Sequence, residues 1–365
     1  MITYPTASDL QSLVGEATYP LVSIVVPTQR ISSSDADRIM VNNAVSEAAE
    51  RLEVERLEKE TVRGITTRLN GMVKGLDYGH MQDGLALFVS EGSASAFHLS
   101  FAPRPAVTVD STYMLKPIVR QLDLERPYYL LALSEQHTRL WAGVRNRLDE
   151  IEDGGFPAEH LGVGGATAVP TGYGKRSSQL RDEGHRQFFR QVLANLWERL
   201  HQENRPVVVA GIGRYHDFLE EIGGLGAETM GVITGNVDRV PVKDLGEQSW
   251  AAIREQQDRD RERWLVEARD AVASGNATTG LDDIYQSALT GAVGRLVAEE
   301  SYVVQARVES SGHLISTLEA GIGPDHADDA IDFIAAEVLR RGGEVRYVND
   351  GDLPDLGRAV AMLRY

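Results

Sequence analysis

The amino-acid sequence predicts a mixed α/β protein built from three domains. Helical and strand patterns alternate along most of the chain, and 365 residues are too many for one ordinary hydrophobic core. The pattern changes after Glu125–Pro127, where closely spaced strands begin, and again at the charged helical stretch 254–263. We therefore expect an N-terminal α/β domain at residues 1–124, a middle domain at 125–253 and a C-terminal α/β sandwich with a long connector helix at 254–365.

The N-terminal domain is expected to combine short strands with two amphipathic helices. Leu21–Val26 is a β-branched run that ends before a proline, which is typical of a buried strand. The polar tract Ser32–Asp37 can cap the first helix, because its side-chain oxygens accept hydrogen bonds from free backbone N–H groups. Leu85–Val89 and Ala96–Leu99 indicate two further strands joined by a turn.

The middle domain begins with three closely spaced strand candidates, at 128–133, 138–144 and 147–151, which predict an antiparallel meander. A helix expected from Glu183 to about Asn204 and further strand and helix alternation complete an arrangement that resembles the ribonuclease-H-like fold. Nuclease chemistry of that fold needs carboxylates that converge from the central strands, and the first strand carries none.

A glycine-rich segment, Leu161–Arg181, separates the meander from the helix. Its glycines and its proline favour a long irregular loop, which in a compact domain is either functional or disordered. It contains Lys175, Arg176 and Arg181 and no acidic residue, in a chain whose formal net charge is -17. The segment is therefore a candidate contact for a phosphate backbone, and a disordered surface insertion is the alternative.

The C-terminal region is expected to begin with a long helix from about Val242, whose charges of both signs, such as Glu255 with Arg259, indicate an exposed connector. Helices and strands then alternate to the end of the chain. The acidic cluster Asp325–Asp329 follows a proline at a helix start, so we interpret it as helix capping rather than as a metal site.

Composition limits the classes of function. The chain has no cysteine, which excludes disulfides and thiolate metal sites. No apolar run approaches a membrane span and the N-terminus does not resemble a signal peptide, so we expect a cytoplasmic protein without a membrane partner. A pI near 5.0 disfavours indiscriminate nucleic-acid binding and predicts that any RNA contact uses a restricted patch.

The last part of the chain carries motifs that resemble a known family. Asp283 followed by Gly291–Val293 and Leu296 is similar to one family segment. Gly357 followed by Leu363–Tyr365 is similar to its closing strand. With the order of the three domains and the glycine-rich loop, these motifs resemble the bacterial archaeo-eukaryotic release factor family, third type. That family is related to the archaeal and eukaryotic class-1 peptide-chain release factors and to Pelota.

The resemblance implies a function for the loop. In release factors the corresponding loop carries Gly-Gly-Gln, whose glycines let the backbone enter the peptidyl-transferase centre and whose glutamine places the attacking water. Here Gly164 and Gly165 are present and Ala166 occupies the next position, where its side chain has no polar atom to hold a water. The resemblance thus implies a ribosome-associated, tRNA-mimicking translation factor that occupies the A site in hibernation, rescue or release, and that acts mainly by binding.

The resemblance also implies partners, namely ribosomal and transfer RNA in the A site and an elongation-factor-like GTPase at the C-terminal domain. We expect no cofactor and no metal. Two alternatives stay open: a peptidyl-tRNA or tRNA hydrolase whose loop backbone places the water, and a protein-interaction adaptor that does not bind ribosomes. The residues expected to contact RNA are Gly164, Gly165, Ala166, Lys175, Arg176, Arg181 and Arg186.

Overall fold

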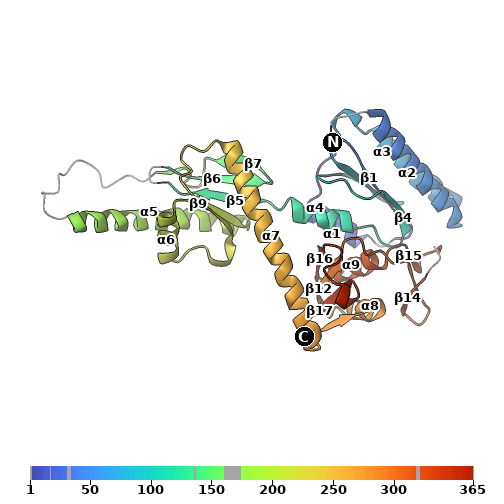
Figure 1. Cartoon of the computed structure of the whole chain (residues 1–365). Helices are drawn as coiled ribbons and strands as arrows, with labels where there is room; N and C mark the ends of the chain where they lie inside the picture. The colour runs from blue at the N-terminus through green and yellow to red at the C-terminus, as the bar shows by residue number, and fades with distance from the viewer. Residues whose placement is uncertain are drawn as a thin grey trace. The chain divides into compact units, whose positions relative to one another are not determined.

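The protein forms two compact units, each of mixed α/β structure (Figure 1). The first unit joins Met1–Leu124 to Arg261–Tyr365, and the second is Glu125–Asp260. The N-terminal and C-terminal parts of the chain thus share one unit, and the finer division into three domains stays a prediction. The computed structural model describes residues 2–16, 18–30, 34–134, 137–159, 174–317 and 321–364.

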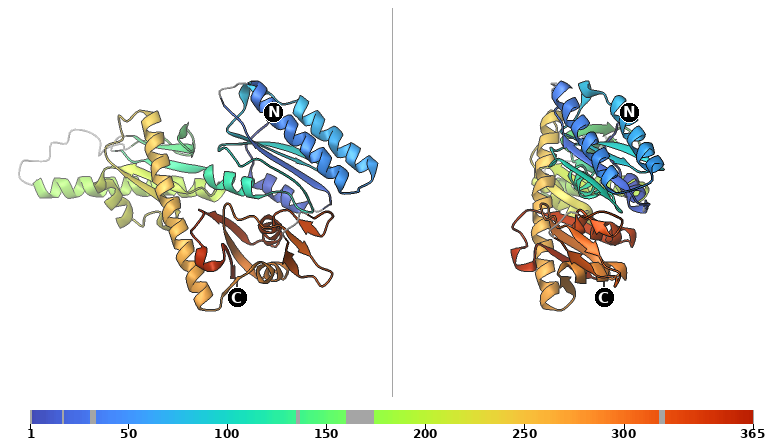
Figure 2. Two further views of the ribbon diagram at one scale, coloured as in Figure 1. Left: turned by 45° about the vertical axis from the view of Figure 1, so that its right-hand side comes forward. Right: turned by 90° about the vertical axis from the view of Figure 1, so that its right-hand side faces the viewer.

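An antiparallel sheet with the strand order β3-β2-β1-β4 organises the N-terminal part of the first unit. Its central strands β1 and β2 are buried along nearly their whole length, because both faces of the sheet are covered. Helices α2 and α3 lie side by side over one face (Figure 2). The elements are β1 (Leu21–Pro27), α2 (Ser34–Val54), α3 (Lys59–Lys74), η1 (Tyr78–His80), β2 (Gly84–Val89), β3 (Ala94–Leu99) and β4 (Ala106–Asp110).

The opposite face of this sheet explains why the two ends of the chain form one unit. Helix α1 (Ala7–Gly15) and helix α4 (Lys116–Leu124) pack there around Phe88 and Tyr113, and Ala336 of the C-terminal helix α9 belongs to the same buried cluster. Burial of apolar surface is the main favourable term in folding, so the shared cluster stabilises both parts together.

The C-terminal part has a mixed four-stranded sheet with the order β11-β17-β12-β16 and a three-stranded sheet with the order β14-β13-β15. Helices α8 and α9 pack on the larger sheet around Leu296 and Ile334. Its elements are α7 (Val242–Ala273), β11 (Ala277–Thr279), α8 (Leu281–Leu289), β12 (Val293–Glu299), β13 (Ala306–Val308), β14 (Leu314–Ser316), β15 (His326–Ala327), α9 (Ala330–Arg340), β16 (Glu344–Val348), η3 (Pro354–Leu356) and β17 (Ala359–Leu363).

The predicted connector helix is confirmed as α7, which is continuous through the charged stretch and belongs to both units. Between β12 and β13 the chain turns at Tyr302. The Tyr302 N–H donates to the carbonyl of Glu299, and the Tyr302 carbonyl accepts from Lys116 Nζ at 3.2 Å, so β13 begins only at Ala306.

The second unit is built on a sheet with the order β10-β9-β5-β6-β7, and β8 pairs with β6. The meander β5-β6-β7 is antiparallel, as expected, while β5, β9 and β10 are parallel. This order agrees with the expected alternation, and the ribonuclease-H-like assignment stays a prediction. The elements are β5 (Tyr128–Ala132), β6 (His137–Val144), β7 (Arg147–Ile151), β8 (Ala158–Glu159), α5 (Gly174–Gln202), β9 (Val207–Gly211), α6 (Gly213–Glu221), η2 (Gly226–Glu228) and β10 (Thr229–Thr234).

Alternate residues of β5 serve two cores on opposite faces of this sheet. Tyr129 and Leu131 pack with α5 and α6. Tyr128 and Leu130 pack with residues from the first turns of α7. Successive side chains of a strand point to opposite faces, so a strand buried on both sides is apolar without interruption. In the described part of the chain, no helix has the length and apolar character needed to cross a membrane.

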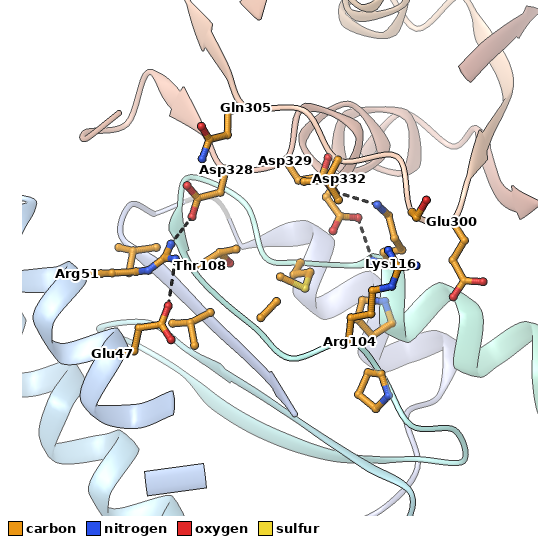
Figure 3. Close-up of a pocket in the computed structure, with 18 of the residues that line it drawn as sticks. Glu47, Arg51, Arg104, Thr108, Lys116, Glu300, Gln305, Asp328, Asp329 and Asp332 are labelled. Atoms are coloured by element: carbon orange, nitrogen blue, oxygen red, sulfur yellow. Dashed lines mark hydrogen bonds and ion pairs between the residues drawn. The ribbon is translucent and has the colours of Figure 1, made fainter. Parts of the chain in front are cut away.

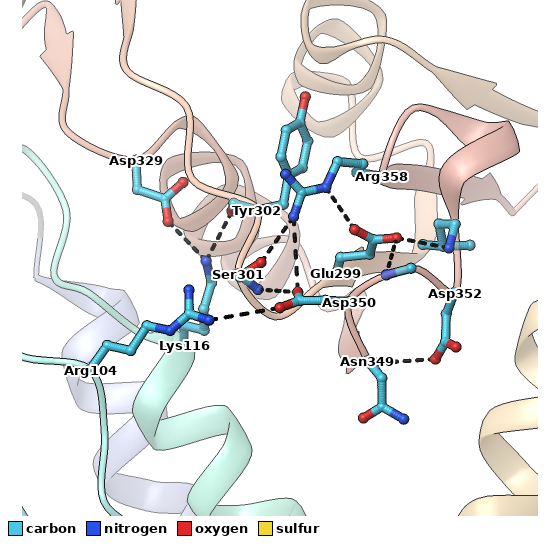
Figure 4. Close-up of polar contacts among 12 residues, drawn as sticks. Arg104, Lys116, Glu299, Ser301, Tyr302, Asp329, Asn349, Asp350, Asp352 and Arg358 are labelled. Atoms are coloured by element: carbon cyan, nitrogen blue, oxygen red, sulfur yellow. Dashed lines mark hydrogen bonds and ion pairs between the residues drawn. The ribbon is translucent and has the colours of Figure 1, made fainter.

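A buried carboxylate fastens the end of β12 to the segment between β16 and β17 (Figure 4). Glu299 is 2% exposed and accepts a hydrogen bond at 2.9 Å from each of the backbone N–H groups of Gly351 and Leu353. The Arg358 guanidinium donates to it at 2.6 Å and to the Ser301 hydroxyl at 3.0 Å. Burial opposes ionisation, but the bonds from Arg358 and the two amides outweigh it and lower the pKa of Glu299.

We expect the substitution Glu299→Gln to destabilise the protein by roughly 2 to 3 kcal/mol at neutral pH, because a neutral amide replaces the carboxylate that accepts from Arg358 and from two backbone N–H groups. The folded-state pKa of Glu299 is depressed, so its stabilisation is present above the unfolded pKa of about 4.3 and is lost as the pH falls through the folded value. Urea unfolding from neutral pH down to about pH 3 measures this difference, which should shrink on acidification.

The control is Glu255→Gln, which removes an ion pair with Arg259 in which both side chains are more than half exposed. That change should cost less than about 0.5 kcal/mol. An equal loss for the two variants, or a loss at Glu299 that does not depend on pH, would contradict the assigned role of the buried carboxylate.

Candidate functional site

The glycine-rich segment begins after β8 and ends at α5. Gly164, Gly165 and Ala166 lie outside the described residues. Helix α5 begins at Gly174, so the expected irregular loop is wrong for residues 174–181, which are helical. The physical reason is that residues 175–181 contain no glycine or proline, and nothing in their sequence interrupts a helix.

Lys175, Arg176 and Arg181 are therefore placed on the N-terminal part of α5, with side chains that lie outside the described part of the structure. A helix fixes the directions in which their Cα–Cβ bonds point, and residues five or six positions apart on a helix point in different directions. The structure thus places the basic residues at the junction where the loop meets the helix.

An aromatic cluster holds this end of α5 against α6. His185 of α5 is buried and stacks on Phe218 of α6, with 6.0 Å between the ring centroids. Phe189 packs edge-on to Tyr215 at 5.4 Å. All four rings lie on the apolar side of the two helices, and Phe189 and Phe218 belong to the main core of the unit. Burial therefore supports α5 from His185 onward.

Arg186, the remaining predicted contact residue, is held by acidic neighbours. Its Nε donates to Glu221 at 2.6 Å, and Glu183 lies 3.8 Å from its Nη1. The guanidinium lies 4.8 Å from the ring centre of Phe218, in cation–π geometry. The hydrogen bond with Glu221 raises the pKa of Arg186. A phosphate that binds Arg186 would compete with Glu221 for the same guanidinium.

The turn between β7 and β8, shortly before the glycine-rich segment, is bound to the same helix. Asp153 pairs with Arg199, and the amide of Asn195 donates to the carbonyl of Gly155 at 3.2 Å. Gly155 has a φ of +84°, and a Cβ at this position would lie 2.2 Å from the Asn195 side chain. Helix α5 therefore binds the chain shortly before the glycine-rich segment as well as continuing it.

The first unit contains a second candidate site, which the sequence did not indicate. A cavity of about 900 Å³ lies between the N-terminal sheet and the C-terminal part (Figure 3). Lys116, which is partly buried, lies in its wall: its backbone N–H donates to Asp332 at 3.0 Å, and its Nζ donates to Asp329 at 2.9 Å. On the other side, Arg51 pairs with Asp328 at 2.9 Å.

The acidic cluster near residue 325 thus has two structural roles. Asp329 is the N-cap of α9 and accepts a hydrogen bond from the Ile331 N–H, which confirms the capping interpretation. Asp328 and Asp329 also pair with Arg51 and Lys116 from the N-terminal part. Across the described ranges, no group of three or more His, Asp or Glu side chains has the arrangement of a metal site.

Sequence reasoning missed the cavity because its residues come from distant parts of the chain: Lys116 and Asp332 are 216 positions apart. One signal was available. Asp332 interrupts the apolar inner face of α9, between Ile331 and Ile334, and is itself buried. A carboxylate in such a position needs a partner from another element.

The architecture defines a mixed α/β protein of two compact units, the second of which contains β8 before and α5 after the glycine-rich segment. Residues 127–291 match the family model of bacterial archaeo-eukaryotic release factor family 3. The match confirms, over this part of the chain, the family resemblance expected from the sequence. It includes the whole glycine-rich segment and ends at residue 291, before the closing motif at Leu363–Tyr365.

Solved structures with which the chain can be aligned over its full length include an archaeal translation termination factor, aRF1, and Pelota of Archaeoglobus fulgidus. The first is 16% identical with a TM-score of 0.24, and the alignment covers 100% of this chain and 99% of that one. The second is 14% identical with a TM-score of 0.34, covering 100% and 94%.

A third structure is described as a model of ribosome-bound archaeal Pelota and ABCE1. It is 12% identical with a TM-score of 0.43, and the alignment covers 100% of this chain and 95% of that one. A comparison with curated proteins found no match.

We expect Phe218→Ala to loosen the stem of the loop. Truncation of this buried ring should cost about 3 to 5 kcal/mol in the stability of the second unit and should speed amide hydrogen exchange in the N-terminal half of α5. The variant Phe218→Leu, which keeps most of the apolar volume, should cost less. Hydrogen exchange read by mass spectrometry measures both.

Val232→Ala is the control, because Val232 is 54% exposed on β10 of the same unit. It should leave exchange in α5 unchanged. Unaltered protection of α5 in Phe218→Ala would show that the aromatic cluster does not anchor the helix.

Proposed function

We propose that the protein is a ribosome-associated, tRNA-mimicking translation factor that acts mainly by binding in the A site. The observation that carries this proposal is the family match, which spans the glycine-rich segment and both of its supports, β8 and α5. Gly164, Gly165 and Ala166 would approach the peptidyl-transferase region. Hibernation, rescue and release are the processes in which such a factor would act.

The described geometry supports a binding role for the stem. The chain before the segment, at Asp153 and Gly155, is bound to the helix that follows the segment, and such a connection lowers the entropic cost of binding a partner there. Lys175, Arg176 and Arg181 follow the loop directly on α5, where they would neutralise phosphates beside it. Arg186 would join them only by exchanging Glu221 for a phosphate.

The side chain at position 166 favours binding over catalysis. Alanine cannot orient a water through a hydrogen bond, so hydrolysis of a peptidyl-tRNA ester would depend on backbone groups alone. A peptidyl-tRNA hydrolase is therefore the second candidate. An adaptor without ribosome binding is the third, and the acidic balance of the chain, -17, is the observation that favours it.

The proposed partners are ribosomal and transfer RNA in the A site, together with an elongation-factor-like GTPase that contacts the C-terminal part. The GTPase proposal rests on the family resemblance, in which the corresponding domain docks partner proteins. A cytoplasmic location follows from the ribosomal partner.

We expect the purified protein to co-sediment with bacterial ribosomes, and binding to weaken as salt is raised, because released counterions drive phosphate contacts. The triple variant Lys175→Glu, Arg176→Glu and Arg181→Glu should lose binding by at least about a hundredfold, since it replaces three attractive charges by repulsive ones.

The matched control is the triple variant Lys243→Glu, Arg259→Glu and Arg263→Glu, which makes the same change in net charge at exposed positions of α7. It should bind ribosomes almost as the unmodified protein does. If both triple variants lost ribosome binding equally, overall charge alone would explain the loss. If the unmodified protein did not bind ribosomes at low salt, the translation-factor proposal would be refuted.

A peptide-release assay separates the binder from the hydrolase. Ribosomes that carry a labelled peptidyl-tRNA should yield no free peptide above background when the protein is added, because Ala166 places no water. Peptide release by the unmodified protein, lost in the Lys175, Arg176 and Arg181 triple variant, would favour the hydrolase instead.

A further inference from the structure

The cavity of the first unit has an excess of acidic side chains. Among the described residues that line it, eight are Asp or Glu and four are Lys or Arg. The basic residues are already engaged: Arg51 with Asp328 and Glu47, Lys116 with Asp329, Arg120 with Glu300 and Arg104 with Asp350. The charge that remains without a counter-charge is therefore negative.

Asp332 is the acidic residue whose hydrogen bonding is incomplete. It is 4% exposed, and its Oδ1 accepts from the Lys116 N–H at 3.0 Å and from the Tyr347 hydroxyl at 3.2 Å. Its Oδ2 is buried and has no hydrogen-bond partner in the described structure. A buried acceptor of this kind costs free energy unless a donor reaches it, and Asp332 lines the cavity from which a donor can come (Figure 3).

The other walls of the cavity indicate the shape of that donor. Val107 and Val109 of β4, Met114 and Ile322 provide an apolar surface beside the carboxylates. The volume, about 900 Å³, is that of a small-molecule site. Since the described acidic groups do not converge as three ligands on one point, the site fits an extended organic cation better than a compact divalent ion, which takes six or more oxygens.

We propose that this cavity binds a small aliphatic amine of the polyamine type, with one ammonium group on Asp332 Oδ2 and the methylene chain along the apolar wall. The amine supplies the missing donor and the missing positive charge together. A second ammonium group on the same flexible chain can reach another carboxylate that lines the cavity, such as Glu50.

The ionisation of Asp332 agrees with such a ligand. Burial, reinforced by the neighbouring charge of Asp329, raises the pKa of Asp332 to about 7 against the opposing effect of Lys116. At neutral pH the empty site therefore carries a partly protonated carboxyl. A bound ammonium favours the carboxylate, so binding should release part of a proton.

The test is isothermal titration calorimetry on the full chain at neutral pH with spermidine, putrescine and butane-1,4-diol. Both amines should bind, and the diol, which matches putrescine in length but carries no charge, should not. Asp332→Asn should weaken amine binding by about 10- to 100-fold, which corresponds to the loss of one charged hydrogen bond. It should also abolish the proton release on binding, which is measured by repeating the titration in two buffers that differ in ionisation enthalpy.

A second pair of variants keeps the test decisive if Asp332→Asn does not fold. Val303→Lys puts a positive charge at a cavity-lining residue that is 59% exposed, and Val266→Lys puts one on α7 at a residue that is 57% exposed and does not line the cavity. Only Val303→Lys should weaken binding.

The proposal would be overturned if the amines bound Asp332→Asn as tightly as the unmodified protein, or if both lysine variants weakened binding equally. Either result would show that the heat of binding comes from general attraction between a cation and an acidic protein. The absence of amine binding, or preferential binding of magnesium or inorganic phosphate, would overturn it as well.

Discussion

The contacts of Lys116 with the C-terminal part of the chain are the constraint on which the first unit depends. Its Nζ donates to Asp329 and to the Tyr302 carbonyl, and its backbone N–H donates to Asp332. Both side chains of the Lys116–Asp329 pair are nearly buried, so their desolvation must be offset by good geometry. This geometry fixes the start of α4 to the start of α9, and the cavity opens beside that junction.

The two units distribute charge in opposite ways. In the second unit, basic residues follow the glycine-rich segment along α5, while the cation nearest to them in the described structure, Arg186, is neutralised by Glu221. In the first unit, acidic residues surround a cavity and every basic residue on its wall has an acidic partner. An acidic protein can thus contain a cluster of basic residues in one unit and an acidic cavity in the other, because charges separated by more than a Debye length are largely screened from each other.

Local patterns in the sequence predicted most buried strands and long helices correctly. The β-branched run Leu21–Val26, the meander from 128 to 151 and the charged helix from Val242 are all confirmed. Short elements such as α1 and α4 were missed, because nine residues carry little periodic signal and their stability comes from the shared core. The start of α5 was placed too late, since the glycines before it masked a helix-compatible stretch.

Of the candidate sites, the basic residues near the loop could be found from the sequence because they are contiguous. The cavity could not, because its carboxylates acquire their environment only when β4, α4 and α9 meet. The discontinuous first unit also has a consequence for biosynthesis. Residues 125–260, the whole second unit, are synthesised before α9 and β16 exist to complete the core around Phe88. The face of the N-terminal sheet that α1 and α4 cover is therefore completed only after the second unit has been synthesised, when α9 adds Ala336 to the buried cluster.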